Sequence, residues 1–477
     1  MINNYKNTNI NSKASQVRVR LAPSPTGLFH IGNVRTVLFN YLFAKKNKGK
    51  IILRIEDTDI ERSEEKYEKD IIKSLKWLGL EWDEGPIKQS ERTEIYEKYI
   101  KKLLNSGDAF WCDHTKEELE KEKKEQIEKK EAPRHICNRK GKAKSGIIRF
   151  RCPDKKIVFN DLIKGKLEFN GKLLGDIGIA KNEKTPLYNL AVVIDDAEMK
   201  ISHVIRGEDH ISNTPKQLLI FEALGFNPPQ YAHNSLTLGS DKSKLSKRHG
   251  ATAIKDYIEM GYLPEALINF MVFLGWHPGN EREIFSLKEL EQEFSLEKMN
   301  KSNAIFNLEK LDWFNAYYIK KMDLDKLTKL CIPYLEKDTD FDYARKIIAL
   351  EQERIKKLSE IGEITKFFFT NELKYDSDLL IWKKMSLKEV KNNLELLEKE
   401  LSEIVDFSQK ALQDILMPLT EKHGTGELLW LLRAALTGQK ASPGPFEIME
   451  VLGKEKTLKR IRDAIEKVKC KIPNLSI

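Results

Sequence analysis

The sequence predicts an α/β protein in which a doubly wound, Rossmann-like domain carries an inserted α+β segment and precedes an all-α C-terminal region. Three observations lead to this prediction. Strand-like and helix-like patterns alternate up to residue 111, which is typical of a parallel sheet with crossover helices. The pattern changes from Cys112 onward and later resumes, which indicates an insertion. From residue 320 or so the strand signals fade and helical periodicity dominates.

A break separates the first strand from the first helix. Residues 17–21 alternate apolar and polar side chains, which predicts a strand. Two prolines and a glycine in residues 23–27 then interrupt the pattern. Apolar side chains recur at helical spacing over residues 31–42, and the short apolar run at residues 51–55 predicts a buried parallel strand.

Two further helices are expected before the insertion. Ser63 is a candidate N-cap for the first, and Gly79 is a candidate for ending it in a left-handed conformation. The second helix stops near Gly107. Strand, helix, strand and helix at this spacing favour a doubly wound sheet.

The inserted segment begins with lysines and glutamates at residues 116–131, which predict a solvated helix. Three short apolar runs after it predict strands, namely residues 147–151, 157–160 and 187–194. Helix and strand then alternate again, with a helix at residues 214–225 and a strand at residues 231–238. Helical periodicity marks the C-terminal region most clearly at residues 311–318, 347–361 and 428–436.

The composition is that of a highly charged soluble protein. The chain has 477 residues, 40% of them hydrophobic, and a formal net charge of +9, which permits a nucleic-acid partner without demonstrating one. Five scattered cysteines suggest no disulfide framework and so a reducing, cytoplasmic location. The first 16 residues lack the apolar core of a signal peptide, and no apolar run is long enough to span a membrane.

The first candidate site lies in the break after the first strand. It consists of Pro23, Ser24, Pro25, Thr26, Gly27, His30, Ile31, Gly32 and Asn33. A helix N-terminus offers unpaired N–H groups and partial positive charge, which suit phosphate. His30 is placed to bond a phosphate or ribose oxygen, and Gly32 would let a flat adenine approach the backbone. Taken alone, a histidine at a helix start is more often a helix cap or a packing residue than a ligand-binding one.

The second candidate site is a charged loop that comprises Lys244, Leu245, Ser246, Lys247 and Arg248. One interpretation is a solvated surface loop. The other is a cationic loop that closes over a triphosphate and neutralises the charge that develops on departing pyrophosphate.

The two sites together, in this order, resemble the HIGH-like and KMSKS-like signatures of class I aminoacyl-tRNA synthetases. The chain has His-Ile-Gly-Asn and Lys-Leu-Ser-Lys-Arg, so Asn33 and Arg248 depart from the general pattern as they do in the glutamate branch. The segments Arg20-Leu-Ala-Pro-Ser-Pro-Thr-Gly and Arg54-Ile-Glu-Asp-Thr-Asp also resemble bacterial glutamyl-tRNA synthetases. So do the segments that start at Tyr188, at Val204 and at Leu432. The resemblance extends from Val17 to the C-terminus.

The resemblance implies that L-glutamate is activated with ATP, accompanied by Mg²⁺, and transferred to tRNA(Glu). It assigns the glutamate contacts to Arg20, Ala22, Ser24, Glu56, Tyr188 and Arg206. Arg206 would hold the side-chain carboxylate and Glu56 the ammonium. The chemistry fits, because free glutamate has two carboxylates and one ammonium, and arginine binds carboxylates with two parallel hydrogen bonds. The alternative for Arg20 and Glu56 is a structural ion pair.

The resemblance also implies how the reaction is catalysed. His30, Lys244 and Lys247 would position ATP and stabilise charge while the α-carboxylate of glutamate attacks the α-phosphate. The same residues, with Gly32, would form the ATP site. Enzymes of this branch typically need bound tRNA before they activate glutamate.

A metal site is not expected. Some relatives bind zinc in the inserted segment through Cys-x-Cys and Cys-x-His pairs. Here the matching stretches are Phe110-Trp-Cys112 and Cys137-Asn-Arg139, which lack two of the four ligands, so we predict no zinc.

The helical C-terminal region is expected to bind the anticodon. Arg354 falls near the family position that senses the third anticodon base, although a surface arginine on a helix is the commoner explanation. Whether tRNA(Gln) is charged as well as tRNA(Glu) stays open at this point. The family precedent is a monomer.

The resemblance divides the chain into a disordered extension and four ordered segments. These are the extension at residues 1–16, the first half of the catalytic domain at 17–111, the inserted acceptor-binding segment at 112–195, the second half at 196–325 and the anticodon-binding region at 326–477.

Four alternative functions are less consistent with the sequence. Glutaminyl-tRNA synthetases carry different residues at the two opening motifs. A truncated paralogue that glutamylates a modified base lacks the C-terminal helices. Small nucleotidyltransferases usually lack them as well. A non-catalytic tRNA-binding protein would be expected to have lost His30 or Lys247, and both are present.

Overall fold

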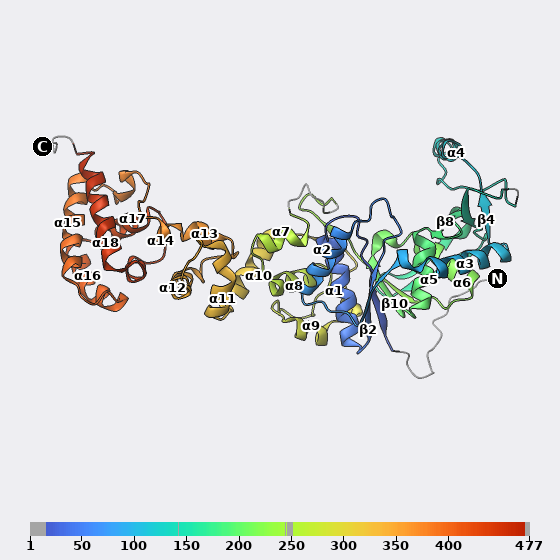
Figure 1. Ribbon diagram of the computed structural model, residues 1–477, viewed down its shortest axis with the longest axis horizontal. Helices are drawn as coiled ribbons and strands as arrows, with labels where there is room; N and C mark the ends of the chain where they lie inside the picture. Colours follow the sequence, from blue (N-terminus) through green and yellow to red (C-terminus); the bar gives the residue numbers. More distant parts are fainter. Residues whose placement is uncertain (1–15, 142, 244, 246–250, 473–477) are drawn as a thin grey trace. The chain divides into compact units, whose positions relative to one another are not determined.

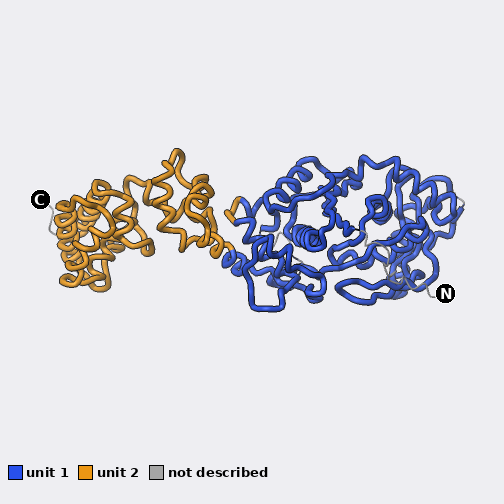
Figure 2. Tube along the Cα trace, turned by 90° about the horizontal axis from the view of Figure 1, so that it is seen from below, with its two compact units in different colours: residues 1–258, 263–314 blue, residues 259–262, 315–477 orange. Residues whose placement is uncertain are grey.

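The computed structural model describes residues 16–141, 143–243, 245 and 251–472. Of the predicted N-terminal extension, only Gln16 is among them. Two compact units make up the chain: unit 1 is Met1–Ile258 with Leu263–Phe314, and unit 2 is Glu259–Tyr262 with Asn315–Ile477 (Figure 2).

Unit 1 begins with a parallel sheet, as the sequence predicts. Its strands are β1 (Arg18–Leu21), β2 (Lys50–Ile55) and β3 (Glu84–Lys88), in the order β1-β2-β3. The crossover helices are α1 (Ile31–Lys46) and α2 (Glu65–Trp77) (Figure 1). Helix α2 ends where Gly79 adopts a φ of 71°, but its N-cap is Glu64 and no side chain caps it, so the prediction of Ser63 as the cap was wrong.

The second half of the fold contributes another sheet, in the order β10-β11-β6-β7. Its strands are β6 (Lys156–Asp161), β7 (Gly165–Asn170), β10 (His203–Gly207) and β11 (Gln230–Asn234). Helix α6 (Thr214–Leu224) connects β10 to β11, which run parallel. The two sheets meet at β1 and β10, where the Ser202 amide donates to the Arg18 carbonyl at 2.9 Å. The carboxyl ends of β1 and β10 are therefore neighbours.

The inserted segment forms its own antiparallel sheet, β4-β5-β8-β9. The strands are β4 (Ala109–Cys112), β5 (Ile147–Phe150), β8 (Ile177–Asn182) and β9 (Thr185–Pro186). Helix α4 (Lys116–Glu128) starts with a capping box between Thr115 and Glu118 and buries none of its residues. The predicted solvated helix is thus confirmed.

The strand predicted at residues 187–194 is wrong, because this run is the start of helix α5 (Tyr188–Glu198). Every residue from Leu190 to Asp196 is buried. A segment buried on all sides shows neither helical nor strand periodicity, so its sequence does not distinguish the two.

The remaining elements of unit 1 surround these sheets. They are α3 (Thr93–Ser106), β12 (Thr237–Leu238), α8 (Pro264–Phe273), α9 (Leu287–Glu293) and β13 (Ala304–Ile305), with α7 (Ile254–Glu259) and α10 (Leu308–Lys321) at the division between the units. Short 3-10 turns include η1 (Gln89–Arg92) and η3 (Glu208–His210).

Unit 2 is helical throughout its described residues. Its helices are α11 (Leu324–Cys331), α12 (Phe341–Glu351), α13 (Glu360–Ile364), α14 (Lys366–Phe369), α15 (Leu387–Glu403), α16 (Gln409–His423), α17 (Thr425–Thr437) and α18 (Pro445–Lys469). A leucine-rich core joins α15 to α18. The all-α prediction is confirmed, although the run at residues 347–361 breaks after Glu351. Within the ranges given above, no helix has the length and apolar character needed to cross a membrane.

Candidate functional site

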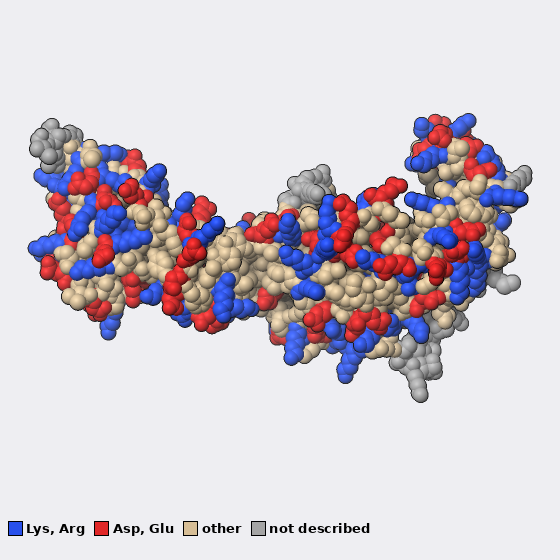
Figure 3. Space-filling model, viewed as in Figure 1, with Lys and Arg blue, Asp and Glu red and all other residues tan. Residues whose placement is uncertain are grey.

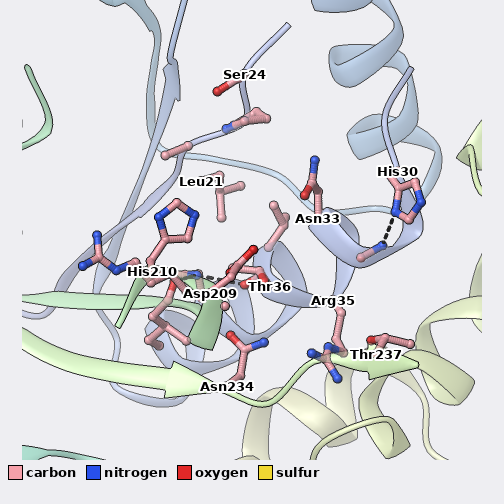
Figure 4. A pocket seen from close by; sticks show the side chains of 18 of the residues that line it. Leu21, Ser24, His30, Asn33, Arg35, Thr36, Asp209, His210, Asn234 and Thr237 are labelled. Carbon is pink, nitrogen blue, oxygen red and sulfur yellow. Dashed lines mark hydrogen bonds between the residues drawn. The ribbon is translucent and has the colours of Figure 1, made fainter. Parts of the chain in front are cut away.

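A cavity of about 340 Å³ opens at the carboxyl ends of β1 and β10, beside the N-terminus of α1. Figure 4 shows which side chains surround it: His30, Asn33, Arg35 and Thr36 from α1 and its cap, and Asp209, His210, Asn234 and Thr237 from the second half of the fold. In doubly wound folds, ligands bind at this edge of the sheet.

His30 is the N-cap of α1. Its backbone is extended, with φ −88° and ψ 144°, and its Nδ1 accepts a hydrogen bond from the Gly32 amide at 3.0 Å (Figure 4). A Cβ added to Gly32 would lie 3.2 Å from Nδ1 of His30, which is tighter than ordinary contact. The absence of a side chain at Gly32 thus keeps the imidazole in place at a helix end that suits phosphate.

Four buried charges connect the two halves of the fold at the floor of the cavity. Arg54 donates to Glu56 Oε1 at 2.8 Å and to Asp196 Oδ1 at 2.7 Å. Arg20 donates to the same oxygen of Asp196 at 3.2 Å. All four side chains are at most 8% exposed. Two cations and two anions alternate, so no buried charge in this group lacks a counter-charge.

The two carboxylates of this group differ in acidity. Burial raises the pKa of Glu56, and the attraction of Arg54 and Arg20 only partly opposes it. Burial acts on Asp196 in the same direction, but the two arginines outweigh it and hold its pKa below the usual value. Asp196 is thus the fixed anion, and Glu56 is the one that gains from an additional cation.

Arg206 reaches the cavity from β10. Its Nε donates to Nε2 of His233 at 3.1 Å, and its Nη2 donates to the Thr214 hydroxyl at 2.9 Å. The guanidinium carbon also lies 5.3 Å from the centre of the Tyr231 ring. Tyr188 stands nearby on α5, with its hydroxyl 3.1 Å from Nδ1 of His210. Burial lowers the pKa of His210 to about 4, so this ring is neutral at pH 7.

The structure brings most of the predicted site residues to this one cavity. Those that line it are Arg20, Ala22, Pro23, Ser24, Thr26, His30, Gly32, Asn33, Glu56, Tyr188, Arg206 and Leu245. Pro25, Gly27 and Ile31 belong to the same turn without lining it. Lys244, Ser246, Lys247 and Arg248 lie outside the described residues.

Arg354 belongs to unit 2 and is 38% exposed. Its Nε lies 3.2 Å from Oε2 of Glu351, the last residue of α12. Burial raises the pKa of Glu351 to about 7, against the attraction of Arg354. The side chain of Arg354 is thus partly exposed and is also paired with a buried carboxyl group.

Several lining residues were not predicted from the sequence, among them Arg35, Thr36, Asn40, Asn234 and Thr237. Arg35 is buried and donates to the carbonyls of Leu274, at 2.6 Å, and Ser235. A polar residue on an otherwise apolar helix face was the available signal: Arg35 and Asn40 both interrupt the buried run of α1. Asn234 ends strand β11, where ligands are expected in this fold, but the predicted strand ran on to residue 238.

The inserted segment brings four metal-binding side chains together. The ligand atoms of Cys112, His114, His135 and Cys137 all lie within 4.8 Å of one another. Cys112 Sγ is 3.4 Å from Nδ1 of His114 and 3.5 Å from Nε2 of His135. The argument that two ligands are missing was therefore wrong: the chain has Cys-x-His and His-x-Cys pairs in place of the expected ones.

The geometry of these four residues fits a tetrahedral metal. Two thiolates and two imidazoles are a typical zinc ligand set. The other ring nitrogen of His135, Nδ1, lies 2.6 Å from Glu122 Oε2 on α4. Metal-bound histidines commonly direct their second nitrogen to a carboxylate in this way.

Charge on the viewed face is mixed. Figure 3 shows Lys and Arg side chains interspersed with Asp and Glu over both units, without one continuous basic surface. This agrees with the modest net charge of +9.

Comparison with known proteins adds to this geometry. Residues 16–313 match the family model of the class I tRNA synthetases (E and Q), catalytic domain, and residues 326–465 match an anticodon binding domain. A glutamate–tRNA ligase 2 of Thermoanaerobacter pseudethanolicus is 44% identical over 473 residues, covering 95% of this chain and 98% of that protein. The glutamate–tRNA ligase of Carboxydothermus hydrogenoformans is 42% identical, with 93% and 99% covered. A crystal structure of the glutamate tRNA ligase of Elizabethkingia meningosepticum, in complex with its amino acid, has a TM-score of 0.85 and 34% identity, with 95% and 99% covered.

Proposed function

The chain belongs to the class I tRNA synthetases of the glutamate and glutamine branch, and we propose that its cavity holds L-glutamate and ATP side by side. The activity is that of a glutamate–tRNA ligase. L-glutamate and ATP give glutamyl-AMP and diphosphate, and glutamate then passes to the 3′-terminal adenosine of tRNA(Glu).

One observation carries the amino-acid site: Arg20, Glu56 and Arg206 line the same cavity although they come from three different strands or strand ends. Three arginines and two carboxylates line this cavity, which gives it one net positive charge. Glutamate carries one net negative charge, so its binding would neutralise the cavity.

We assign each charged group of glutamate to one lining residue. Arg206 binds the side-chain carboxylate and Arg20 contacts the amino acid near its α-carboxylate. Glu56 accepts from the ammonium, which would lower the carboxyl pKa that burial raises. Tyr188 contributes its hydroxyl, and Ala22 and Ser24 complete the contacts.

ATP would bind at the start of α1. His30 and the partial positive charge of the helix N-terminus would face the phosphates, and Gly32 leaves room for the adenine. Mg²⁺ would arrive with ATP. Lys244 and Lys247 would neutralise the departing pyrophosphate. No side chain acts as a nucleophile, so catalysis consists of positioning and charge stabilisation.

The helical region at residues 326–477 would read the anticodon, with Arg354 as a candidate for its third base. Glu351 would hold Arg354 in a defined orientation for this purpose. The other segments are assigned as the sequence predicts: catalytic halves at residues 17–111 and 196–325, and an acceptor-binding insertion at residues 112–195. We propose a cytoplasmic monomer, and we leave tRNA(Gln) as a second substrate to be tested.

We also propose that the inserted segment binds one zinc ion through Cys112, His114, His135 and Cys137. The donor set and the Glu122 contact support this. Bound zinc would supply structure rather than chemistry, because the set is closed and four-coordinate. Through Glu122 it would attach α4 to the loop that carries His135 and Cys137.

Aminoacylation tests the function directly. Radiolabelled glutamate, ATP and Mg²⁺ are incubated with transcripts of tRNA(Glu) or tRNA(Gln) in separate reactions, with glutamine as the control amino acid. Charging of tRNA(Glu) with glutamate is expected. Charging of tRNA(Gln) as well would show a non-discriminating enzyme. Failure to charge either transcript would refute the proposed assignment of the cavity.

A further inference from the structure

The contact between Arg206 and His233 extends one residue deeper, to Asp161. Oδ2 of Asp161 lies 2.6 Å from Nδ1 of His233, and both side chains are fully buried. Asp161 is the last residue of β6, in the inserted segment, and His233 lies on β11 directly opposite Arg206 on β10. The three side chains thus form a line across three neighbouring strands.

The hydrogen atoms of this line have one consistent arrangement. Burial would raise the pKa of Asp161, but hydrogen bonds from His233 and from the backbone amides of Lys164 and Ile163 hold it below its usual value. The ionised carboxylate can only accept, so Nδ1 of His233 carries a hydrogen. Burial lowers the pKa of His233, so the ring is neutral and Nε2 has a lone pair. That lone pair accepts the Nε–H of Arg206 at 3.1 Å.

This arrangement fixes the plane of the guanidinium. Arg206 Nε is held by His233, one Nη2 hydrogen is held by Thr214, and the plane lies near the Tyr231 ring. Of the five N–H groups of an arginine, three remain for a ligand. A carboxylate that binds with two parallel bonds needs such a fixed fork.

We propose that Asp161 and His233 are positioning residues that orient Arg206 toward the side-chain carboxylate of glutamate. The inference rests on the proposed placement of glutamate at Arg206. The ionised Asp161 selects the ring tautomer, and the ring holds the arginine. Neither residue lines the cavity, so both act through Arg206.

The test separates positioning from general stability. His233→Leu removes the acceptor while it keeps an apolar volume, and His233→Gln keeps an oxygen near the position of Nε2. Asp161→Asn keeps the shape but offers N–H donors to the ring, which favours the wrong tautomer. We expect His233→Leu and Asp161→Asn to raise the KM for glutamate ten- to a hundredfold, the range of one charge-assisted hydrogen bond. The KM for ATP and for tRNA(Glu) should stay within about twofold.

Two controls sharpen this comparison. His233→Gln should restore the glutamate KM to within about threefold of the wild type. His203→Leu removes a partly buried histidine of β10 and should leave the glutamate KM unchanged, because His203 lies at the opposite end of that strand from Arg206. In a variant that already carries Arg206→Lys, His233→Leu should raise the KM for glutamate little further, since the two residues act as a unit.

The dissociation constant of a non-reactive glutamyl-adenylate analogue, measured by calorimetry, provides a readout that needs no tRNA. This dissociation constant should rise in His233→Leu by about the same factor as the KM for glutamate. Equal effects on the ATP and glutamate KM values, or additive effects with Arg206→Lys, would overturn the proposal. If the wild type binds the analogue but charges no tRNA, the ligase assignment fails. The affinity of His233→Leu for the analogue then still decides whether His233 orients Arg206. If His233→Leu does not fold, His233→Gln and Asp161→Asn decide.

Discussion

Arg54 donates two hydrogen bonds to one oxygen of Glu56, Oε1, from Nη2 at 2.8 Å and from Nε at 3.3 Å. Arg54 is fully buried and Glu56 is 8% exposed, at the edge of the cavity. Because both bonds fall on Oε1, the second oxygen is the candidate acceptor for the substrate ammonium. Arg54 therefore orients Glu56 without entering the cavity itself.

Loss of Arg54 should destabilise unit 1. Arg54→Met leaves Asp196 and Glu56 as two buried carboxylates without their shared cation. We expect the free energy of unfolding, from urea denaturation, to fall by about 3–5 kcal/mol. Arg62→Met is the matched control, because Arg62 is 70% exposed, and it should change stability by no more than about 0.5 kcal/mol. Equal stability of the two variants would contradict the role of Arg54.

Substitution of Arg206 should affect glutamate far more than ATP. Arg206→Ala removes both N–H groups of the carboxylate fork, so the KM for glutamate should rise a hundredfold or more, in the range of about 3 kcal/mol for charge-assisted bonds. Arg206→Lys keeps the charge but loses the fork, and should fall between the wild type and Arg206→Ala. Steady-state aminoacylation with either substrate varied provides the measurement. A parallel rise in both KM values would move Arg206 out of the side-chain pocket.

Lys247 should act on activation rather than on tRNA binding. Lys247→Ala removes a cation assigned to departing pyrophosphate, so ATP–pyrophosphate exchange in the presence of tRNA(Glu) should slow by about a hundredfold. The dissociation constant for tRNA(Glu), from filter binding, should stay within about twofold. Lys242→Asn is the control: it removes a nearby charge at a backbone φ of 62°, which asparagine tolerates. Unchanged exchange in Lys247→Ala would refute the assignment of the loop.

Zinc should accompany the purified protein at about one ion per chain, as measured by plasma emission spectrometry. Cys112→Ser and Cys137→Ser should each lose the metal, whereas Cys331→Ser, a buried cysteine of α11, should retain it. Cobalt reconstitution of the wild type should give thiolate-to-metal absorption that either ligand variant lacks. Metal-free protein from zinc-supplemented cells would disprove the site.

Stability should depend on pH through His203. Burial lowers the pKa of His203 to about 4, against about 6.5 in the unfolded chain. Between these values the unfolded state binds the proton and the folded state does not, so stability falls as pH falls. The contribution is fully present above pH 6.5 and is lost toward pH 4. His203→Gln removes it, and the difference in unfolding free energy between wild type and variant should shrink by about 2 kcal/mol from pH 7 to pH 4.5. A constant difference would contradict this.

The sequence was most informative where a pattern is local. The turn from β1 to α1 and the alternation of strands and helices could be predicted, because both depend on neighbouring residues. Helix α5 could not, since burial on all sides removes its periodicity. The metal-binding side chains were not predicted, because the expected pairs were Cys-x-Cys and Cys-x-His. A histidine can replace a cysteine as a ligand wherever its ring nitrogen reaches the same position, as His114 and His135 do here.

Contacts between distant strands were also beyond the sequence. His233 and Asp161 are 72 positions apart and meet because β11 pairs with β6, a strand of the insertion. Nothing in either local pattern indicates this pairing. Asp196 belongs to the segment that starts at Tyr188. Its ion pairs with Arg20 and Arg54 depend on how α5 packs against two strands, which the sequence does not indicate.

The exposure of α4 has a consequence for local opening. The helix buries no side chain, and three of its residues connect it to the following loop: Glu118 to Arg139, Glu122 to His135, and Gln126 to the backbone of Arg134. A helix without a core has little free energy to resist opening. In metal-depleted protein its amides should exchange with deuterium within seconds, while those of β1 and β2 stay protected. If the proposed site holds zinc, the order of α4 would vary with the zinc supply of the surroundings, whereas that of β1 and β2 would not.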